Sequence, residues 1–581
     1  MFPAKSPVVC QLYRRREEDD DSSVSCGHDN PAFVSVPLDE GDAAAGANAS
    51  NINLGTRGNV TVSAPPSASK DISLLKNGPP DRQDTHKLPN GKPQGSVEQK
   101  EVISSCGEAK PAVTQQVLAA FLAALTHVAL GAIVGLPGVT LPQLTDPRSS
   151  DLHLGINQVA LFGSLIHVGG VIGSMVGGVL NMRVGQRVTL LVAMPLSLVL
   201  WLALAFTPSV WLLLFLRALL GATQGLVGAA SNNYVVEIAQ KEIRGRLTGF
   251  TDTGRQVGFL LVYVVGSLDL TWREVMLVCG CITAVPPFIG LLFMPDSPRW
   301  LVTKGRLEEA RKALAFFRGP RYDSQPEYDD IIQQFEHTTN NKTGFSDQMN
   351  QMREPSVFRR MVFLAFLMVA VQFTGNMSIA TYVVPIFQAS NSTFNSYTSA
   401  ILIGCIRVVG TVVSQLLADR LSRRIMVIIP CLACSVTLAV LGAYFFVQSQ
   451  QMDVSSIGWL PLTALMVYTP FVCIVQAAIS ILRAEILPTS IRAFSAAIMY
   501  VFFFMGMFAA TYTFPAMVGT IGEYGAFWSY SASCVIIALV VGHVLPDTRG
   551  LSLEQIDDLF RYGKKYIMQS MNSRFPPQKI P

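Results

Sequence analysis

Twelve runs of apolar residues, each long enough to cross a lipid bilayer, limit what this chain can fold into. They begin near Val117, Gln158, Val188, Trp211, Gly249, Val275, Met361, Tyr397, Ile425, Leu460, Phe494 and Phe527. A helix of about 20 apolar residues crosses the hydrocarbon core. Inside lipid the backbone must satisfy its own hydrogen bonds, which a helix does. Because hydrophobic residues make up 50% and charged residues 14% of the chain, an ordinary soluble protein is excluded. The sequence predicts an all-α membrane protein with twelve transmembrane helices.

Three charged motifs occur twice in the chain, in the same order. The matched pairs are Glu237–Arg244 with Glu485–Arg492, Arg183–Arg187 with Arg420–Arg424, and Pro295–Leu301 with Pro546–Gly550. Each copy lies at the end of one apolar run or at the start of the next. Repetition of this kind indicates internal duplication. We therefore expect two halves of six helices each.

The polar segments between the apolar runs define the expected domains. The N-terminal tail contains an acidic run and is too polar to bury a core, so it should be disordered. Within the central linker, Leu307–Phe317 and Tyr328–His337 have the spacing of short amphipathic helices. The expected domains are a cytosolic tail at 1–112, a six-helix bundle at 113–296, a cytosolic linker at 297–359, a second bundle at 360–546 and a cytosolic tail at 547–581.

Basic residues in the short loops predict the orientation of the chain. The loops after the second, fourth, eighth and tenth runs are rich in Arg and Lys, whereas most of the loops on the other side have none. Because cytosolic loops carry the excess of Lys and Arg, both termini and the central linker should face the cytosol. Asn391-Ser-Thr would then be extracellular and is the sequon expected to carry a glycan.

The motifs and their order resemble the sugar porter family of the major facilitator superfamily, and within it the facilitated trehalose transporters of arthropods. The resemblance covers about residues 115 to 560. It rests on Arg217-x3-Gly221-x3-Gly225, Tyr234-x2-Glu237, Arg244-Gly245, Pro295-Asp-Ser-Pro-Arg-Trp-Leu301, Asp419-Arg420-x2-Arg423-Arg424 and Pro546-Asp-Thr-Arg-Gly550. It implies the major facilitator fold and facilitative sugar transport at the plasma membrane by alternating access, with trehalose or a hexose as the solute.

The resemblance also implies a sugar site on the seventh helix. Members of the family carry amides and a tyrosine there that hydrogen-bond sugar hydroxyls. In this chain Val371 and Met377 replace two of those amides. The residues expected to bind the sugar are Gln372, Thr374, Asn376 and Tyr382.

Charged residues near the helix ends are expected to control gating. Carboxylates and guanidiniums can form ion pairs in one conformation and lose them in the other, which biases the equilibrium without contact with the solute. The residues in this group are Arg217, Glu237, Arg244, Asp419, Arg420, Arg424, Glu485 and Arg492.

Several ionisable residues lie within the apolar runs, where they are costly unless paired or hydrated. Asp252 and Arg255 are three residues apart on one helix face, and Asp252 stands where many sugar porters carry a sugar-contacting Gln. With Arg407 and His127 they form a possible polar site. They suggest an alternative function, the transport of a charged solute.

A second alternative is a non-transporting solute sensor that signals through its long N-terminal tail. No enzymatic nucleophile, metal cluster or phosphate-binding loop is recognisable, so we expect no enzyme activity, cofactor or metal. The expected partners are a small solute and membrane lipid, without nucleic acid. The sequence leaves the oligomeric state open.

Overall fold

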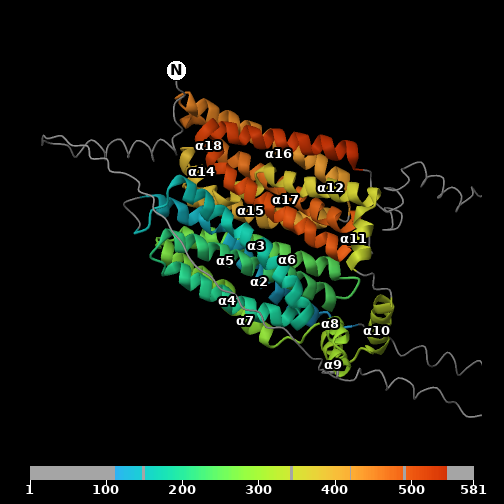
Figure 1. Ribbon diagram of the computed structural model, residues 1–581. Coiled ribbons are helices and arrows are strands. Elements are labelled where there is room, and N and C mark those ends of the chain that lie inside the picture. Colours follow the sequence, from blue (N-terminus) through green and yellow to red (C-terminus); the bar gives the residue numbers. More distant parts are fainter. Residues whose placement is uncertain (1–110, 147–150, 341–344, 419, 488–491, 546–581) are drawn as a thin grey trace, which may run out of the picture. The chain divides into compact units, whose positions relative to one another are not determined.

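The computed structural model describes residues 111–146, 151–340, 345–418, 420–487 and 492–545 (Figure 1). Almost all of the expected N-terminal tail, the C-terminal tail and Asp419 lie outside these ranges. Within them, every regular element is a helix. The prediction of an all-α chain is confirmed for this part of the protein.

Six long helices make up the first half of the bundle. They are α2 (Thr114–Thr145), α3 (Ile156–Val184), α4 (Gln186–Ala205), α5 (Val210–Ile238), α6 (Arg244–Gly266) and α7 (Trp272–Leu292). Glycines spaced four apart allow two pairs of these helices to pack backbone against backbone. A Cβ atom at Gly169 of α3 would lie 1.8 Å from the carbonyl oxygen of Ala218 on α5. At Gly131 of α2 it would lie 1.9 Å from that of Arg255 on α6.

Four shorter helices follow: α8 (Pro298–Thr303), α9 (Leu307–Arg318), α10 (Gln325–Asn340) and α11 (Phe345–Arg353). The two expected amphipathic helices are present as α9 and α10. Leu314 of α9 shares a small apolar core with Tyr328 and Ile331 of α10. Arg318 donates to both carboxylate oxygens of Glu327 at 2.7 and 2.6 Å, and to the Ile238 carbonyl at 2.9 Å. This side chain therefore attaches the linker to the end of α5.

The second half contains one helix broken into pieces and four longer helices. The broken helix comprises α12 (Pro355–Ala370), the 3-10 turn η1 (Val371–Thr374), α13 (Asn376–Thr381) and α14 (Val383–Ala389). The others are α15 (Ser396–Ala418), α16 (Arg423–Ser449), α17 (Leu460–Ile486) and α18 (Arg492–Val544), with the short turn η2 (Ser455–Ile457) before α17. Gly522, with φ 76°, interrupts α18 and divides it into two arms.

Ten segments of the described chain are long and apolar enough to span a membrane. The helix α6 is 23 residues long but carries four charged residues, and it occupies the place of the fifth expected span. The break at Gly522 lies between the eleventh and the twelfth. A membrane protein is thereby confirmed, whereas the count of twelve stays a prediction.

The two halves meet along four pairs of elements: α6 with α15, α3 with α18, α2 with α13, and α2 with α14. Near the start of α6, Gln415 of α15 donates to the Gly249 carbonyl at 2.8 Å. Near its end, the Tyr263 hydroxyl donates to the Ala380 carbonyl of α13, also at 2.8 Å. The broken helix thus lies at the boundary between the halves.

Candidate functional site

The broken helix presents polar side chains in the middle of an apolar bundle. Gly375 lies between η1 and α13 with φ 90° and ψ −2°, a left-handed conformation that suits glycine. A Cβ atom there would lie 2.7 Å from Cδ2 of Tyr530. Transporter folds often bind solute at such interruptions, because backbone irregularity at membrane depth is tolerated where it lines a cavity or is buried in protein.

Gln372 and Thr374 lie on the turn before this break, and both are buried. Nε2 of Gln372 donates to the Met368 carbonyl at 3.2 Å, whereas its Oε1 has no hydrogen-bond partner among the described residues. The Thr374 hydroxyl donates to the Val371 carbonyl at 2.8 Å, and the Thr374 carbonyl accepts from Tyr468 at 2.9 Å. Of the two, Gln372 offers an unused acceptor.

Asn376 begins α13 and connects to the other half through Arg407 of α15. Nη2 of Arg407 donates to Oδ1 of Asn376 at 3.1 Å, and its Nε donates to Oε1 of Gln256 on α6, also at 3.1 Å. The guanidinium lies 5.0 Å from the ring centroid of Phe259. The structure therefore brings the predicted sugar-site residue Asn376 together with Arg407 of the predicted polar site.

Tyr382 lies between α13 and α14 and is buried against both halves. Its hydroxyl donates to the Thr511 carbonyl of α18 at 3.3 Å, and its ring stacks on Phe514 with centroids 5.3 Å apart. A Cβ atom at Gly163 of α3 would lie 2.5 Å from the same hydroxyl. The hydroxyls of Thr381 and Thr511 are buried and have no hydrogen-bond partner among the described residues. Unused polar atoms therefore surround this segment.

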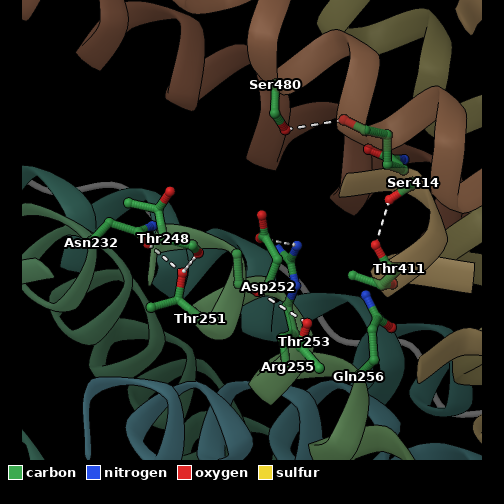
Figure 2. A network of polar contacts seen from close by, with 12 residues as sticks. Asn232, Thr248, Thr251, Asp252, Thr253, Arg255, Gln256, Thr411, Ser414 and Ser480 are labelled. Atoms are coloured by element: carbon green, nitrogen blue, oxygen red, sulfur yellow. Dashed lines mark hydrogen bonds and ion pairs between the residues drawn. The ribbon is translucent and has the colours of Figure 1, made fainter. Parts of the chain in front are cut away.

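Asp252 and Arg255 form the pair that their spacing predicts. Nη2 of Arg255 lies 3.0 Å from Oδ1 of Asp252, and their side chains are 32% and 53% exposed respectively. Figure 2 shows the pair on α6 opposite the exposed Ser480 of α17. His127 is buried on α2, with Nδ1 3.3 Å from the Ala123 carbonyl oxygen. The pair is therefore partly accessible, whereas His127 is buried.

Arg217 was expected near a gate but is fully buried within the first half. Its Nη1 donates to the Ile133 carbonyl at 2.9 Å and its Nε to the Phe162 carbonyl at 3.2 Å. Nη2 is buried and has no hydrogen-bond partner in the described part of the chain. The side chain thus joins α5 to α2 and α3.

The duplicated motifs at the other helix ends form matching contacts. Glu237 accepts from Nε2 of Gln186 at 2.7 Å and also from the Ser297 hydroxyl. In the second half Glu485 accepts from Arg423, with 3.0 Å between Nη2 and Oε1. Arg423 and Gln186 occupy the same position in the two copies of the motif, three residues after Arg420 and Arg183 respectively. The duplication seen in the sequence is therefore also a structural repeat.

The adjacent arginines repeat as well. Arg187 donates to the Leu291 and Leu292 carbonyls at 3.0 and 2.9 Å and lies 3.8 Å from Asp296. Arg424 donates to the Gly542 carbonyl. Burial raises the pKa of Asp296, and the charge of Arg187 offsets part of that rise.

The remaining residues expected to control gating make only local contacts or lie outside the described residues. Arg244 donates to the Ala239 carbonyl at 3.3 Å, so it caps the preceding turn. Arg420 lies in the turn before α16, with its backbone N–H bonded to the Leu417 carbonyl at 3.0 Å. Asp419 and the side chain of Arg492 lie outside the described residues.

Sequence reasoning did not select several residues that hold these sites together. Gln256 lies one turn beyond Asp252, so the helical period could have identified it. Tyr468 and Tyr530 approach the break from distant helices, where no local pattern signals them: the Tyr530 hydroxyl donates to the Ser378 hydroxyl at 3.0 Å. The shape of the site depends on these long-range contacts.

A separate cavity of about 640 Å³ lies where the end of α6 meets the start of α15. Its lining includes Asp269 and Thr271 from the first half and Asn395, Tyr397 and Thr398 from the second. These are hydroxyl, amide, carboxylate and aromatic groups. They lie at the end of α6 opposite to the basic loops.

Comparison with known proteins agrees with this architecture. Residues 115–560 match the family described as sugar (and other) transporter. The facilitated trehalose transporter Tret1 of Polypedilum vanderplanki is 30% identical over 443 residues, covering 76% of this chain and 87% of the relative. The Tret1 of Apis mellifera ligustica is 30% identical over 449 residues, covering 77% and 88%. These matches confirm the resemblance found in the sequence, and the relatives are transporters rather than enzymes, as expected.

Solved structures show the same fold. The partially occluded inward-open conformation of the xylose transporter XylE from E. coli has a TM-score of 0.64 at 22% identity, covering 76% of this chain and all of that one. Its inward-open conformation has a TM-score of 0.63 at 22% identity, with 77% and 100% coverage.

Proposed function

Because this chain belongs to the sugar (and other) transporter family, we propose that it carries a sugar across the membrane by facilitated diffusion, with trehalose or a hexose as the solute. The solute site is the broken helix between the halves, lined by Gln372, Thr374, Asn376 and Tyr382. The two halves rock about this site so that it opens to one side of the membrane at a time.

The observation that carries the proposal is the group of buried polar atoms around Gly375. Oε1 of Gln372 and the hydroxyls of Thr381 and Thr511 have no partner among the described residues. An unmade hydrogen bond of this kind costs about 1 to 3 kcal/mol, so the site favours a ligand rich in hydroxyls. A sugar supplies such groups.

Facilitated rather than proton-coupled transport is supported by the surroundings of Arg217. The sequence of α2 contains no Asp or Glu. The hydrogen bonds of Arg217 within the described part of the chain go to backbone carbonyls of α2 and α3. A carboxylate that could exchange a proton with this guanidinium is therefore missing from the helix it contacts.

The same proposal places the protein in the plasma membrane with both termini in the cytosol. The basic loops support this orientation, and the five domains keep the boundaries expected from the sequence. Asn391 is exposed in the turn after α14, where a glycan could be attached. Loss of a glycosidase-sensitive mass shift in Asn391→Gln would support the orientation, whereas an unglycosylated wild-type protein would argue against it.

Uptake of radiolabelled trehalose and glucose into oocytes tests the function. We expect saturable uptake that Gln372→Ala reduces at least tenfold. Gln450→Ala changes an exposed glutamine in the loop after α16 and should leave uptake unchanged. Surface biotinylation checks that the wild type and both variants reach the plasma membrane in equal amounts. Absence of uptake of either sugar at normal surface expression would contradict the proposal, and binding without uptake would instead favour a sensor.

A further inference from the structure

Two guanidiniums lie deep in the bundle, and within the described residues they donate to neutral oxygens. Arg217 and Arg407 are 0% and 2% exposed. Arg407 donates to Asn376 at the start of α13, whereas Arg217 donates to the Ile133 and Phe162 carbonyls within the first half. Among the described residues, neither has an Asp or Glu within the 4.0 Å that defines an ion pair. An arginine side chain stays charged in proteins, so each of them contributes a full positive charge.

The neighbouring charges do not neutralise this pair of cations. Asp252 lies one turn before Gln256 on α6, but its carboxylate is bound to Arg255 at 3.0 Å. That pair is itself neutral in sum. A buried cation without a counter-charge is costly, and such groups inside a membrane commonly mark solute pathways. The central region therefore has an excess of positive charge that an anionic solute would offset.

Arg407 is the better placed of the two to receive an anion. Its side chain donates to the amide oxygens of Gln256 and Asn376, which belong to different halves. Hydrogen bonds from a guanidinium to a carboxylate are shorter and roughly twice as strong as those to neutral oxygens, and they are frequently bidentate. A solute carboxylate can therefore displace the two amides. The released amides then remain available to hydroxyls on the same solute.

Polar side chains from both halves lie near the groups that this guanidinium binds. Asp252 of α6 and Ser480 of α17 are exposed and lie opposite each other in Figure 2. Gln256 lies one turn further along α6 than Asp252, and Thr411 one turn from Arg407 on α15. The polar side chains thus lead from the end of the bundle where α6 begins to the Arg407 bridge.

We propose that Arg407 is a specificity-determining residue that binds the carboxylate of a sugar acid, a solute that carries both a carboxylate and several hydroxyls. This inference rests on the proposed function, since it places the acid in the same site as the neutral sugar. Arg407 binds the carboxylate, while Gln372, Asn376 and their neighbours bind the hydroxyls. Asp252 and Arg255 form the more exposed part of this polar region and contribute no net charge.

Purified protein in proteoliposomes and in detergent provides the test, with D-glucuronate as the probe and glucose as its neutral counterpart. We expect glucuronate to inhibit labelled glucose uptake at a lower concentration than unlabelled glucose does. Arg407→Gln should raise the inhibition constant of glucuronate at least tenfold and that of glucose less than threefold. The matched control is Arg483→Gln on α17, whose guanidinium contacts Tyr500 at 2.9 Å, and it should leave both constants unchanged.

A thermal-shift measurement on the wild-type protein separates this inference from the proposed function, because it does not require transport. Stabilisation by glucuronate that is lost in Arg407→Gln and kept in Arg407→Lys supports carboxylate binding. If Arg407→Gln does not fold, the test is whether glucuronate stabilises both the wild type and Arg407→Lys. Glucose uptake without any inhibition or stabilisation by glucuronate would overturn the inference and leave the proposed function intact. Failure to transport glucose or trehalose would overturn the proposed function alone, provided that glucuronate still stabilises the protein.

Discussion

Arg423 donates from both Nε and Nη2 to Oε1 of Glu485, at 3.1 and 3.0 Å. In the other half the equivalent carboxylate, Glu237, accepts from the neutral amide of Gln186 at 2.7 Å. The same connection between neighbouring helices is therefore ionic in one half and neutral in the other. A mutation in one half can therefore introduce the type of contact found in the other.

Arg423→Gln should reproduce in the second half the neutral contact of the first. The ion pair is about one-fifth exposed on both sides, so we expect a loss of about 1 kcal/mol or less. Arg423→Ala should cost more, because alanine cannot donate. Melting temperatures in detergent, measured by fluorescence-detected size exclusion, provide the comparison. Equal melting temperatures for wild type and Arg423→Ala would show that the contact does not stabilise the fold.

Tyr263→Phe should weaken the contact between the halves at the far end of α6. The mutation removes the 2.8 Å hydrogen bond to the Ala380 carbonyl, which is worth about 1 kcal/mol, or a roughly fivefold shift in a two-state equilibrium. We expect a Ser267→Cys reporter to react faster with an impermeant maleimide in this background. Tyr444→Phe removes a similar bond, at 2.7 Å to the Ser390 carbonyl, but within the second half, and it should leave labelling unchanged. Identical effects of the two mutations would contradict the assignment.

Gly375→Ala should disrupt the broken helix. Its φ of 90° and the 2.7 Å approach to the Tyr530 ring both oppose a Cβ atom, and such backbone strain costs about 1 to 3 kcal/mol. We expect at least a tenfold loss of uptake and a lower melting temperature. The control is Gly178→Ala on α3, where a Cβ atom would meet nothing within 4 Å. Wild-type uptake by Gly375→Ala would show that the break is not needed for transport.

The stability of the protein should depend on the protonation of Asp296. Burial raises its pKa, and Oδ1 has no hydrogen-bond partner among the described residues. Since the folded state binds the proton more tightly than the unfolded chain, the stabilisation from this group is present below its unfolded pKa and is lost as the pH rises through the folded pKa. Asp296→Asn should therefore have a higher melting temperature than wild type at pH 7 and a smaller difference at pH 4. A lower melting temperature at pH 7 would indicate that the contact with Arg187 dominates.

The sequence predicted the helical membrane architecture because lipid imposes a simple rule on apolar runs, and it predicted the repeat because charges recur at matched positions. It also predicted the Asp252–Arg255 pair, since residues three apart lie on one helix face. It did not predict the bridge from Gln256 through Arg407 to Asn376. That bridge joins three segments whose approach depends on how the halves pack, and single-helix periodicity carries no information about this packing.

Arg217 illustrates a second limit of the sequence. The motif that contains it is typical of sugar porters, and it was grouped with the residues expected to gate the transporter. The structure places its guanidinium against backbone carbonyls of α2 and α3. Backbone acceptors are present at every residue and have no sequence signature, so this contact could only be found in three dimensions.

Entry of labelled trehalose and glucose into proteoliposomes, with and without an inward proton gradient, tests the central claim most directly. We predict that at least one of the two sugars enters saturably and stops at the outside concentration, and that the gradient changes neither the rate nor the final level. Accumulation above the outside concentration under the gradient would contradict facilitated transport. No saturable entry of either sugar, from protein that is folded and inserted, would contradict the assignment of a sugar carrier.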